Sequence, residues 1–168
     1  MTVNKIVLAV LSIGLSSQVM ALELHNAKVL DHREWTTGGA QGWFKSGNPT
    51  TAPSVFSNAS ARASVNSASG SVNSNIYITG NHSFNITNSN KEAKTYEYQY
   101  KLCADNQRCF NYVQHVQVNP GGYVTDSGTS NLAVYFSSAG SYRSSAYTGV
   151  KGDAQSEDTA NGNIYVRK

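Results

Sequence analysis

The segment Thr95–Val118 reads TYEYQYKLCADNQRCFNYVQHVQV and decides the fold class. In its first half, apolar side chains occupy every second position from Tyr96 to Leu102, with polar residues between them. Because successive side chains of a β-strand point to opposite faces, this alternation predicts a strand with one buried face. The half that follows the second cysteine also places its apolar residues on one face, from Phe110 onwards. We therefore predict two strands joined by a short turn.

The two cysteines, Cys103 and Cys109, predict how these strands pair. If they face each other across an antiparallel hairpin, Tyr100 faces Tyr112 and the apolar faces of both strands coincide. A shift by one residue would reverse every face, so this agreement supports the register. We expect a disulfide between the cysteines, because directly opposed side chains lie close enough for a bridge. A metal site is the alternative, but the nearest histidine, His115, has no supporting spacing.

The tyrosines of this hairpin predict its inner face. They are Tyr96, Tyr98, Tyr100 and Tyr112, four of the ten in the chain. Such a row is typical of the inside of a β-sandwich, and the alternative is an exposed binding surface.

Length and composition limit the class of protein. The 168 residues suit one domain, and the formal net charge of +3 argues against a strongly basic nucleic-acid-binding protein. Only 14% of residues are charged, and serine, asparagine and threonine supply most of the polarity. An uncharged polar surface of this kind is typical of exported β-rich proteins.

Further short strands follow at regular intervals on both sides of the hairpin. We predict them at 72–80, 84–87, 123–126, 132–136, 142–150 and 163–167, with a turn at 118–122. No stretch shows the apolar spacing of an amphipathic helix. The sequence therefore predicts an all-β protein, a single antiparallel β-sandwich with a disulfide-pinned hairpin.

The first 21 residues have the pattern of a secretory signal peptide. Lys5 precedes an apolar run from Ile6 to Leu15, and Val19-Met20-Ala21 fits the small-x-small cleavage rule. The run of about ten residues is too short for a spanning helix, which needs about 20. We expect cleavage after Ala21 and a secreted or periplasmic protein that does not insert into the membrane.

The segment 22–71 is less regular, and we expect its strands and loops to pack on the sandwich or extend it. Its part 58–74 is a flexible linker or an edge strand. Trp35, Trp43 and Phe44 lie around a glycine-rich stretch and are the candidate ligand-binding residues. Aromatic rings on loops or flat sheets stack on sugars or enter pockets of a partner. The alternative is that both tryptophans close one end of the core.

From 72 to 168 the order of features resembles an immunoglobulin-like or fibronectin type III-like sandwich. The resemblance is carried by Phe84-Asn85-Ile86-Thr87-Asn88, by the cysteine hairpin, and by Ser138-Ala139-Gly140-Ser141-Tyr142. It implies that the Tyr142 hydroxyl binds backbone upstream, as in a tyrosine corner. The cysteines are too near each other to bridge two sheets, so the resemblance concerns architecture alone. More loosely, the whole chain is similar to small proteins that Gram-negative bacteria export through the Sec pathway, some of which continue by type II secretion.

Residues with catalytic or metal-binding chemistry form no recognisable motif. Asp31-His32-Arg33-Glu34 puts a histidine beside carboxylates, and a solvated strand end is the alternative to an acid–base site there. Asp153, Glu157 and Asp158 form an acidic cluster whose spacing matches no calcium loop. We therefore predict no catalytic residue, no metal ligand and no cofactor.

Together these patterns predict a secreted, non-catalytic binding protein. Its partner would be a carbohydrate or a host or cell-surface protein, not a nucleic acid. The alternative is a structural or assembly component of a surface appendage or of the envelope, and an extracellular hydrolase comes third.

Overall fold

The computed structural model describes residues 4–6, 9–10, 16–38, 56–104 and 108–168. Every regular element in these ranges is a β-strand, which confirms the predicted all-β class. The strands are β1 Asn4–Ile6, β2 Ala9–Val10, β3 Ser16–Met20, β4 Leu22–Gly38, β5 Ser57–Val65, β6 Ala68–Ser71, β7 Asn75–Asn88, β8 Lys94–Ala104, β9 Arg108–Tyr135, β10 Gly140–Lys151 and β11 Ser156–Arg167.

The predicted hairpin is formed by β8 and the first part of β9, in the predicted register. Cys103 pairs with Cys109 and Tyr100 with Tyr112. The predicted disulfide Cys103–Cys109 is present. Tyr98 is completely buried and Tyr100 is 1% exposed. The tyrosine row therefore belongs to the core.

Strand β9 continues where the sequence predicted a turn. Its first part pairs with β8, its second part pairs with β7, and β4 follows both parts. Between the two parts, the ladder with β4 shifts around Asn26, and Gly121 takes a φ of 72°. A glycine suits this left-handed conformation because it has no Cβ atom to clash. The residues 118–122 thus bend the strand without ending it.

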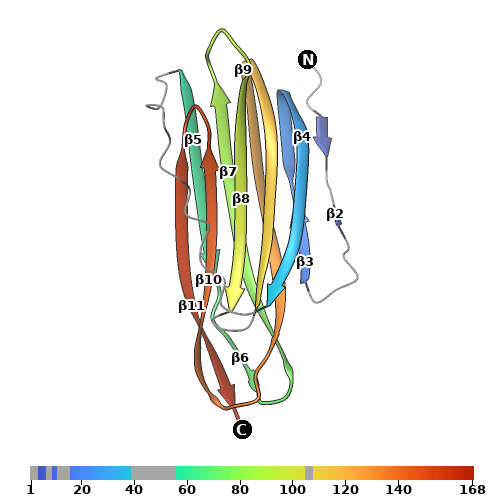
Figure 1. The fold of residues 1–168 in the computed structure, drawn as a ribbon, viewed down its shortest axis with the longest axis vertical. Coiled ribbons are helices and arrows are strands. Elements are labelled where there is room, and N and C mark those ends of the chain that lie inside the picture. The colour runs from blue at the N-terminus through green and yellow to red at the C-terminus, as the bar shows by residue number, and fades with distance from the viewer. Residues whose placement is uncertain (1–3, 7–8, 11–15, 39–55, 105–107) are drawn as a thin grey trace.

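All strands belong to one sheet, which curls because β9 has different neighbours along its length. The first arm of the sheet contains β8, β10, β11 and the first part of β9, and the second arm contains β5, β7 and the rest of β9. Figure 1 shows the curl, with β8 towards the viewer and β7 behind it. The arrangement is consistent with a β-sandwich-like fold.

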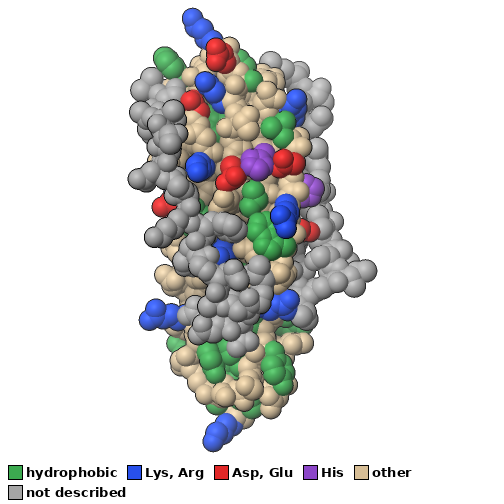
Figure 2. All heavy atoms as spheres, in the orientation of Figure 1, with side chains coloured by type: hydrophobic (Ala, Val, Ile, Leu, Met, Phe, Trp, Pro, Cys, Tyr) green, Lys and Arg blue, Asp and Glu red, His purple; other side chains and the backbone are tan. Residues whose placement is uncertain are grey.

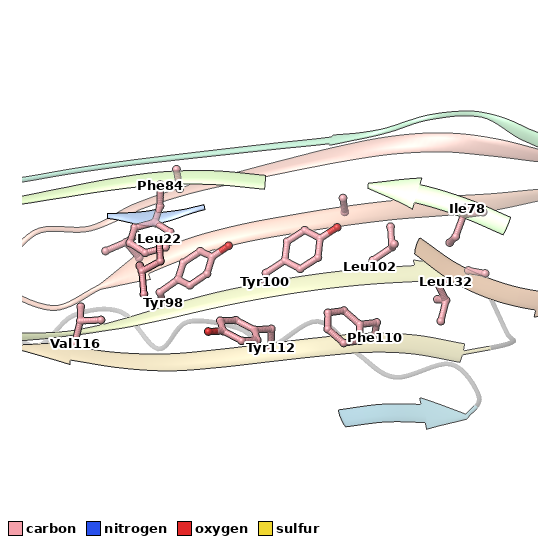
Figure 3. Packing of buried hydrophobic residues seen from close by; sticks show 14 of the residues in the cluster. Leu22, Ile78, Phe84, Tyr98, Tyr100, Leu102, Phe110, Tyr112, Val116 and Leu132 are labelled. Atoms are coloured by element: carbon pink, nitrogen blue, oxygen red, sulfur yellow. The ribbon is translucent and has the colours of Figure 1, made fainter. Parts of the chain in front are cut away.

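The core lies between the two arms. The rings of Phe84 on β7 and Tyr98 on β8 are 3.9 Å apart, although these strands do not pair with each other. Figure 3 shows Tyr98 and Tyr100 side by side on β8, with Leu102 next along the strand. The close approach of the arms depends on Gly80, where an added Cβ would lie 2.5 Å from the Tyr100 hydroxyl.

A seam without a backbone ladder brings the free edge of β5 against β11. The Ala61 amide donates to Ser156 Oγ at 3.1 Å, and the Ala63 amide donates to Asp158 Oδ2 at 2.9 Å. Side chains of β11 thus accept hydrogen bonds from backbone amides of β5. Without these bonds, the edge of β5 would be open to the addition of another strand.

The N-terminal region contains more strand than the sequence indicated. Of the two interpretations for 58–74, the structure agrees with an edge strand, since β5 and β6 occupy most of it. Strand β3 pairs with the second part of β9. The signal peptide remains a prediction. In the described ranges we find no helix long and apolar enough to cross a membrane.

Candidate ligand-binding surfaces

The predicted ligand-binding aromatic residues are only partly placed by the structure. Trp35 lies on β4 opposite Asn111, and its side chain is neither fully buried nor part of the core cluster. The guanidinium group of Arg33 lies 4.9 Å from the centroid of its ring, a cation–π distance. Trp43 and Phe44 lie outside the described residues. The ligand site made of these three residues stays a prediction.

A different pair of aromatic rings is exposed on the outer face of the second arm. Tyr77 on β7 is 61% exposed, and Tyr135 at the end of β9 is 50% exposed. Tyr77 pairs with Ala133, so Tyr135 is its diagonal neighbour on the same face. Diagonal neighbours of this kind lie about 7–8 Å apart. The two rings therefore lie on the same face of the sheet, about one diagonal step apart.

The ring of Tyr135 is anchored at its hydroxyl, which donates to Asn73 Oδ1 at 2.9 Å. Asn73 adopts a φ of 58°, a conformation that asparagine tolerates better than most residues. An anchored ring loses less conformational freedom when a ligand binds it.

Hydroxyl and amide side chains continue this face beyond the tyrosines. Thr79 Oγ1 donates to Asn131 Oδ1 at 2.7 Å, and Thr129 Oγ1 donates to Asn81 Oδ1 at 2.8 Å. Both pairs join β7 to β9, and each hydroxyl donates to an amide oxygen. We call the six residues Tyr77, Tyr135, Thr79, Asn131, Asn81 and Thr129 the tyrosine platform. It combines apolar rings with neutral hydrogen-bonding groups on one sheet face.

Sequence reasoning did not find the platform, although part of the signal was present. Ile76 and Ile78 are buried, so the alternation of β7 turns Tyr77 outwards. The alternation does not reveal that β7 pairs with the second part of β9. This pairing brings Tyr135 beside Tyr77.

The first arm carries a histidine between two carboxylates on its outer face. His115 Nδ1 lies 2.6 Å from Asp31 Oδ1, and His115 Nε2 lies 3.1 Å from Glu97 Oε2. Figure 2 shows histidine and acidic side chains gathered on this face. The hydrogen bond to Asp31 raises the pKa of His115, burial opposes the rise, and the bond to Glu97 adds to it. Its charged form is therefore favoured, as in an ordinary surface ion pair.

Asp31→Asn is expected to lower the pKa of His115, because it removes the largest favourable interaction with the imidazolium. Glu97→Gln should lower it less, since that contact is longer. Titration of the histidine ring protons by NMR measures both shifts. In the native protein, the stabilisation by this raised pKa is complete below pH 6.5 and is lost as the pH rises through the folded-state pKa. An unchanged His115 pKa in Asp31→Asn would contradict the geometry.

The other charged groups that the sequence singled out, around His32 and around Asp153, do not form a common site. The ring of the exposed His32 stacks near Tyr112, with 6.3 Å between centroids. Asp153 accepts hydrogen bonds from Ser57 and Asn90, whereas Asp158 accepts one from the Ala63 amide. Among the residues that the structure describes, no three histidine, cysteine or acidic side chains are placed to hold a metal ion.

A shallow groove lies where β7 is connected to β8. Its volume is about 440 Å³, and it is lined by Phe56, Ser89, Asn90, Lys91, Glu92 and Lys94. The Phe56 ring is 60% exposed. Lys94 Nζ lies 3.9 Å from Glu92 Oε2 and 4.0 Å from Asp153 Oδ1, so charges of both signs meet beside the groove.

Comparison with family models and with curated proteins found no match to this chain.

Proposed function

We propose that this protein is an exported, non-catalytic binding protein that recognises a glycan through the tyrosine platform. The observation that carries the proposal is the exposed pair Tyr77 and Tyr135 on one sheet face beside neutral hydroxyl and amide groups. Sugar rings present apolar C–H faces and many hydroxyls, so they match a surface of aromatic rings and neutral hydrogen-bonding groups.

The rigidity of the platform supports the same function. Its residues lie on paired strands, and the Tyr135 hydroxyl is held by Asn73. Glycans are flexible, and a preorganised surface limits the entropy lost on binding. The platform includes no charged side chain, which favours a neutral glycan over a charged protein partner.

The disulfide supports export, because such bonds persist in oxidising compartments. The predicted signal peptide with cleavage after Ala21 agrees with this location. For the fold, we propose that the curled sheet is an immunoglobulin-like sandwich. The Tyr142 hydroxyl donates to the Ser138 carbonyl at 2.9 Å, as the resemblance to a tyrosine corner implies.

Glycan-array binding of the purified protein tests the proposal. Tyr77→Ala and Tyr135→Ala are each expected to weaken binding about tenfold, which corresponds to about 1.4 kcal/mol. Tyr165→Ala is the matched control, because Tyr165 is 47% exposed but lies on β11, in the first arm.

Three results would count against the platform. The first is that the native protein binds no glycan. The second is that Tyr165→Ala weakens glycan binding as much as the platform variants do. The third is that Trp35→Ala alone abolishes binding. The last result would move the site to β4, where the sequence placed it.

A further inference from the structure

The interior of the curled sheet contains a cluster of polar side chains. His82 on β7, Asp126 on β9, Tyr98 and Tyr100 on β8, and Ser130 on β9 form this polar core cluster. The side chains of His82 and Asp126 have no exposed surface, and Ser130 is completely buried. Neither the tyrosine platform nor the His115 ion pairs include any of these five residues.

The members face one another without direct hydrogen bonds. His82 Nε2 lies 4.0 Å from Asp126 Oδ2, beyond hydrogen-bond distance. The His82 ring lies 4.4 Å from the Tyr100 ring and 6.0 Å from the Tyr98 ring, measured between centroids. Seven polar atoms of the cluster make no protein hydrogen bond of normal geometry: His82 Nδ1 and Nε2, Asp126 Oδ1 and Oδ2, both tyrosine hydroxyls and Ser130 Oγ.

Weaker interactions reach the cluster from its surroundings. The Ser130 hydroxyl opposes the rise that burial causes in the pKa of Tyr100. The backbone at Ser127 similarly opposes the rise in the pKa of Asp126. These interactions fall outside normal hydrogen-bond geometry, so they leave most of the desolvation cost in place. Each buried polar group without a partner costs about 1–3 kcal/mol.

We propose that the polar core cluster is an internal hydration site, in which ordered water bridges His82, Asp126 and the hydroxyls of Tyr98, Tyr100 and Ser130. Buried polar groups in native proteins are nearly always satisfied, and a buried water typically makes two to four hydrogen bonds. Polar atoms separated by slightly more than hydrogen-bond distance are the usual partners of a bridging water.

The chemistry of the cluster favours water over an ion. It contains donors, such as the tyrosine hydroxyls, beside acceptors, such as Asp126, and water serves both. Burial lowers the pKa of His82 to about 4 and raises that of Asp126 to about 6. Near pH 5 both side chains are therefore neutral, and a neutral network has little attraction for a free ion.

Water-selective NMR of the purified protein at pH 5 tests this site. We expect cross-relaxation between water and the ring protons of His82 and Tyr100, although both rings are buried. The double variant His82→Phe with Asp126→Leu replaces two cluster members with apolar side chains. It should lose the water signal at Tyr100, and its resistance to urea should equal or exceed that of the native protein.

Absence of water signals at both rings in the folded native protein would overturn the proposal, and so would scalar coupling across a direct His82–Asp126 hydrogen bond. A water signal at Tyr100 that survives in a folded double variant would also contradict it. If the double variant does not fold, the native spectrum alone decides.

Discussion

The Asp126→Asn variant is expected to gain about 3 kcal/mol of unfolding free energy as the pH rises from 4 to 6.5. The cause is His82, whose pKa is lowered to about 4 by burial, from an ordinary value of 6.5. Between these two values the unfolded chain binds a proton that the folded protein excludes. Acid therefore favours unfolding across this window.

The native protein should show a much flatter profile between pH 4 and pH 6, because Asp126 opposes His82. Burial raises the pKa of Asp126 from 3.8 to about 6, so in this range the folded state holds a proton that the unfolded state releases. The contribution of Asp126 to the unfolding free energy is complete below pH 3.8 and is lost as the pH rises through 6. His82→Gln removes the opposing effect of His82 and keeps that of Asp126, so the stability of this variant should fall by about 2 kcal/mol from pH 4 to pH 6.

Urea unfolding at a series of pH values measures both slopes. The decisive result is the opposite sign of the slope in the two variants. His115→Gln is the control, because the raised pKa of His115 affects stability only above pH 6.5. If Asp126→Asn and His82→Gln kept the native profile, the two groups would not be buried as the structure places them.

Gly80→Ala is expected to destabilise the protein by about 2 kcal/mol, because the interior has no room for the added methyl group. The new Cβ would lie 2.5 Å from the Tyr100 hydroxyl and 2.7 Å from Leu102 Cδ1. Strand β7 would have to move away from β8, which opens the contact between the two arms. Chemical denaturation of the purified variant measures the loss.

A second substitution separates this clash from a general effect of replacing glycine. Tyr100→Phe removes the nearest atom, so in the Gly80→Ala background it should restore part of the stability. Gly140→Ala is the matched control. Its Cβ would come no nearer than 3.6 Å to the Tyr142 ring, and we expect little change. Equal losses in the two alanine variants, or no rescue by Tyr100→Phe, would contradict the packing described for Gly80.

The hairpin could be predicted from sequence because its determinants are local. Alternation in β8 and β9 and the short separation of Cys103 and Cys109 each specify one register, and the structure has that register. The all-β class follows from the same alternation elsewhere in the chain. The hydrogen bond from Tyr142 to Ser138 could also be predicted, since these residues are close in sequence.

Features that depend on distant pairing were not predictable in this way. Pro120-Gly121-Gly122 indicated a turn, and only the continued ladder with β4 distinguishes a bend within one strand from a turn. The tyrosine platform needs Tyr77 and Tyr135 to come from paired strands. His82 could have been assigned to the core, because it continues the inward alternation of Ile78 and Phe84. The sequence around His82 does not indicate that Asp126 is its neighbour in the core.

The length of β9 has a consequence for how this chain folds. The β8–β9 hairpin needs only contacts that are close in sequence, so it can form early, within microseconds. The second part of β9 must then find β7, whose residue Asn75 pairs with Tyr135. Closing so long a loop costs entropy before the contacts compensate for it, and β-proteins rich in such pairings fold in milliseconds to seconds. We therefore expect one strand to contain both the earliest and some of the latest steps of folding.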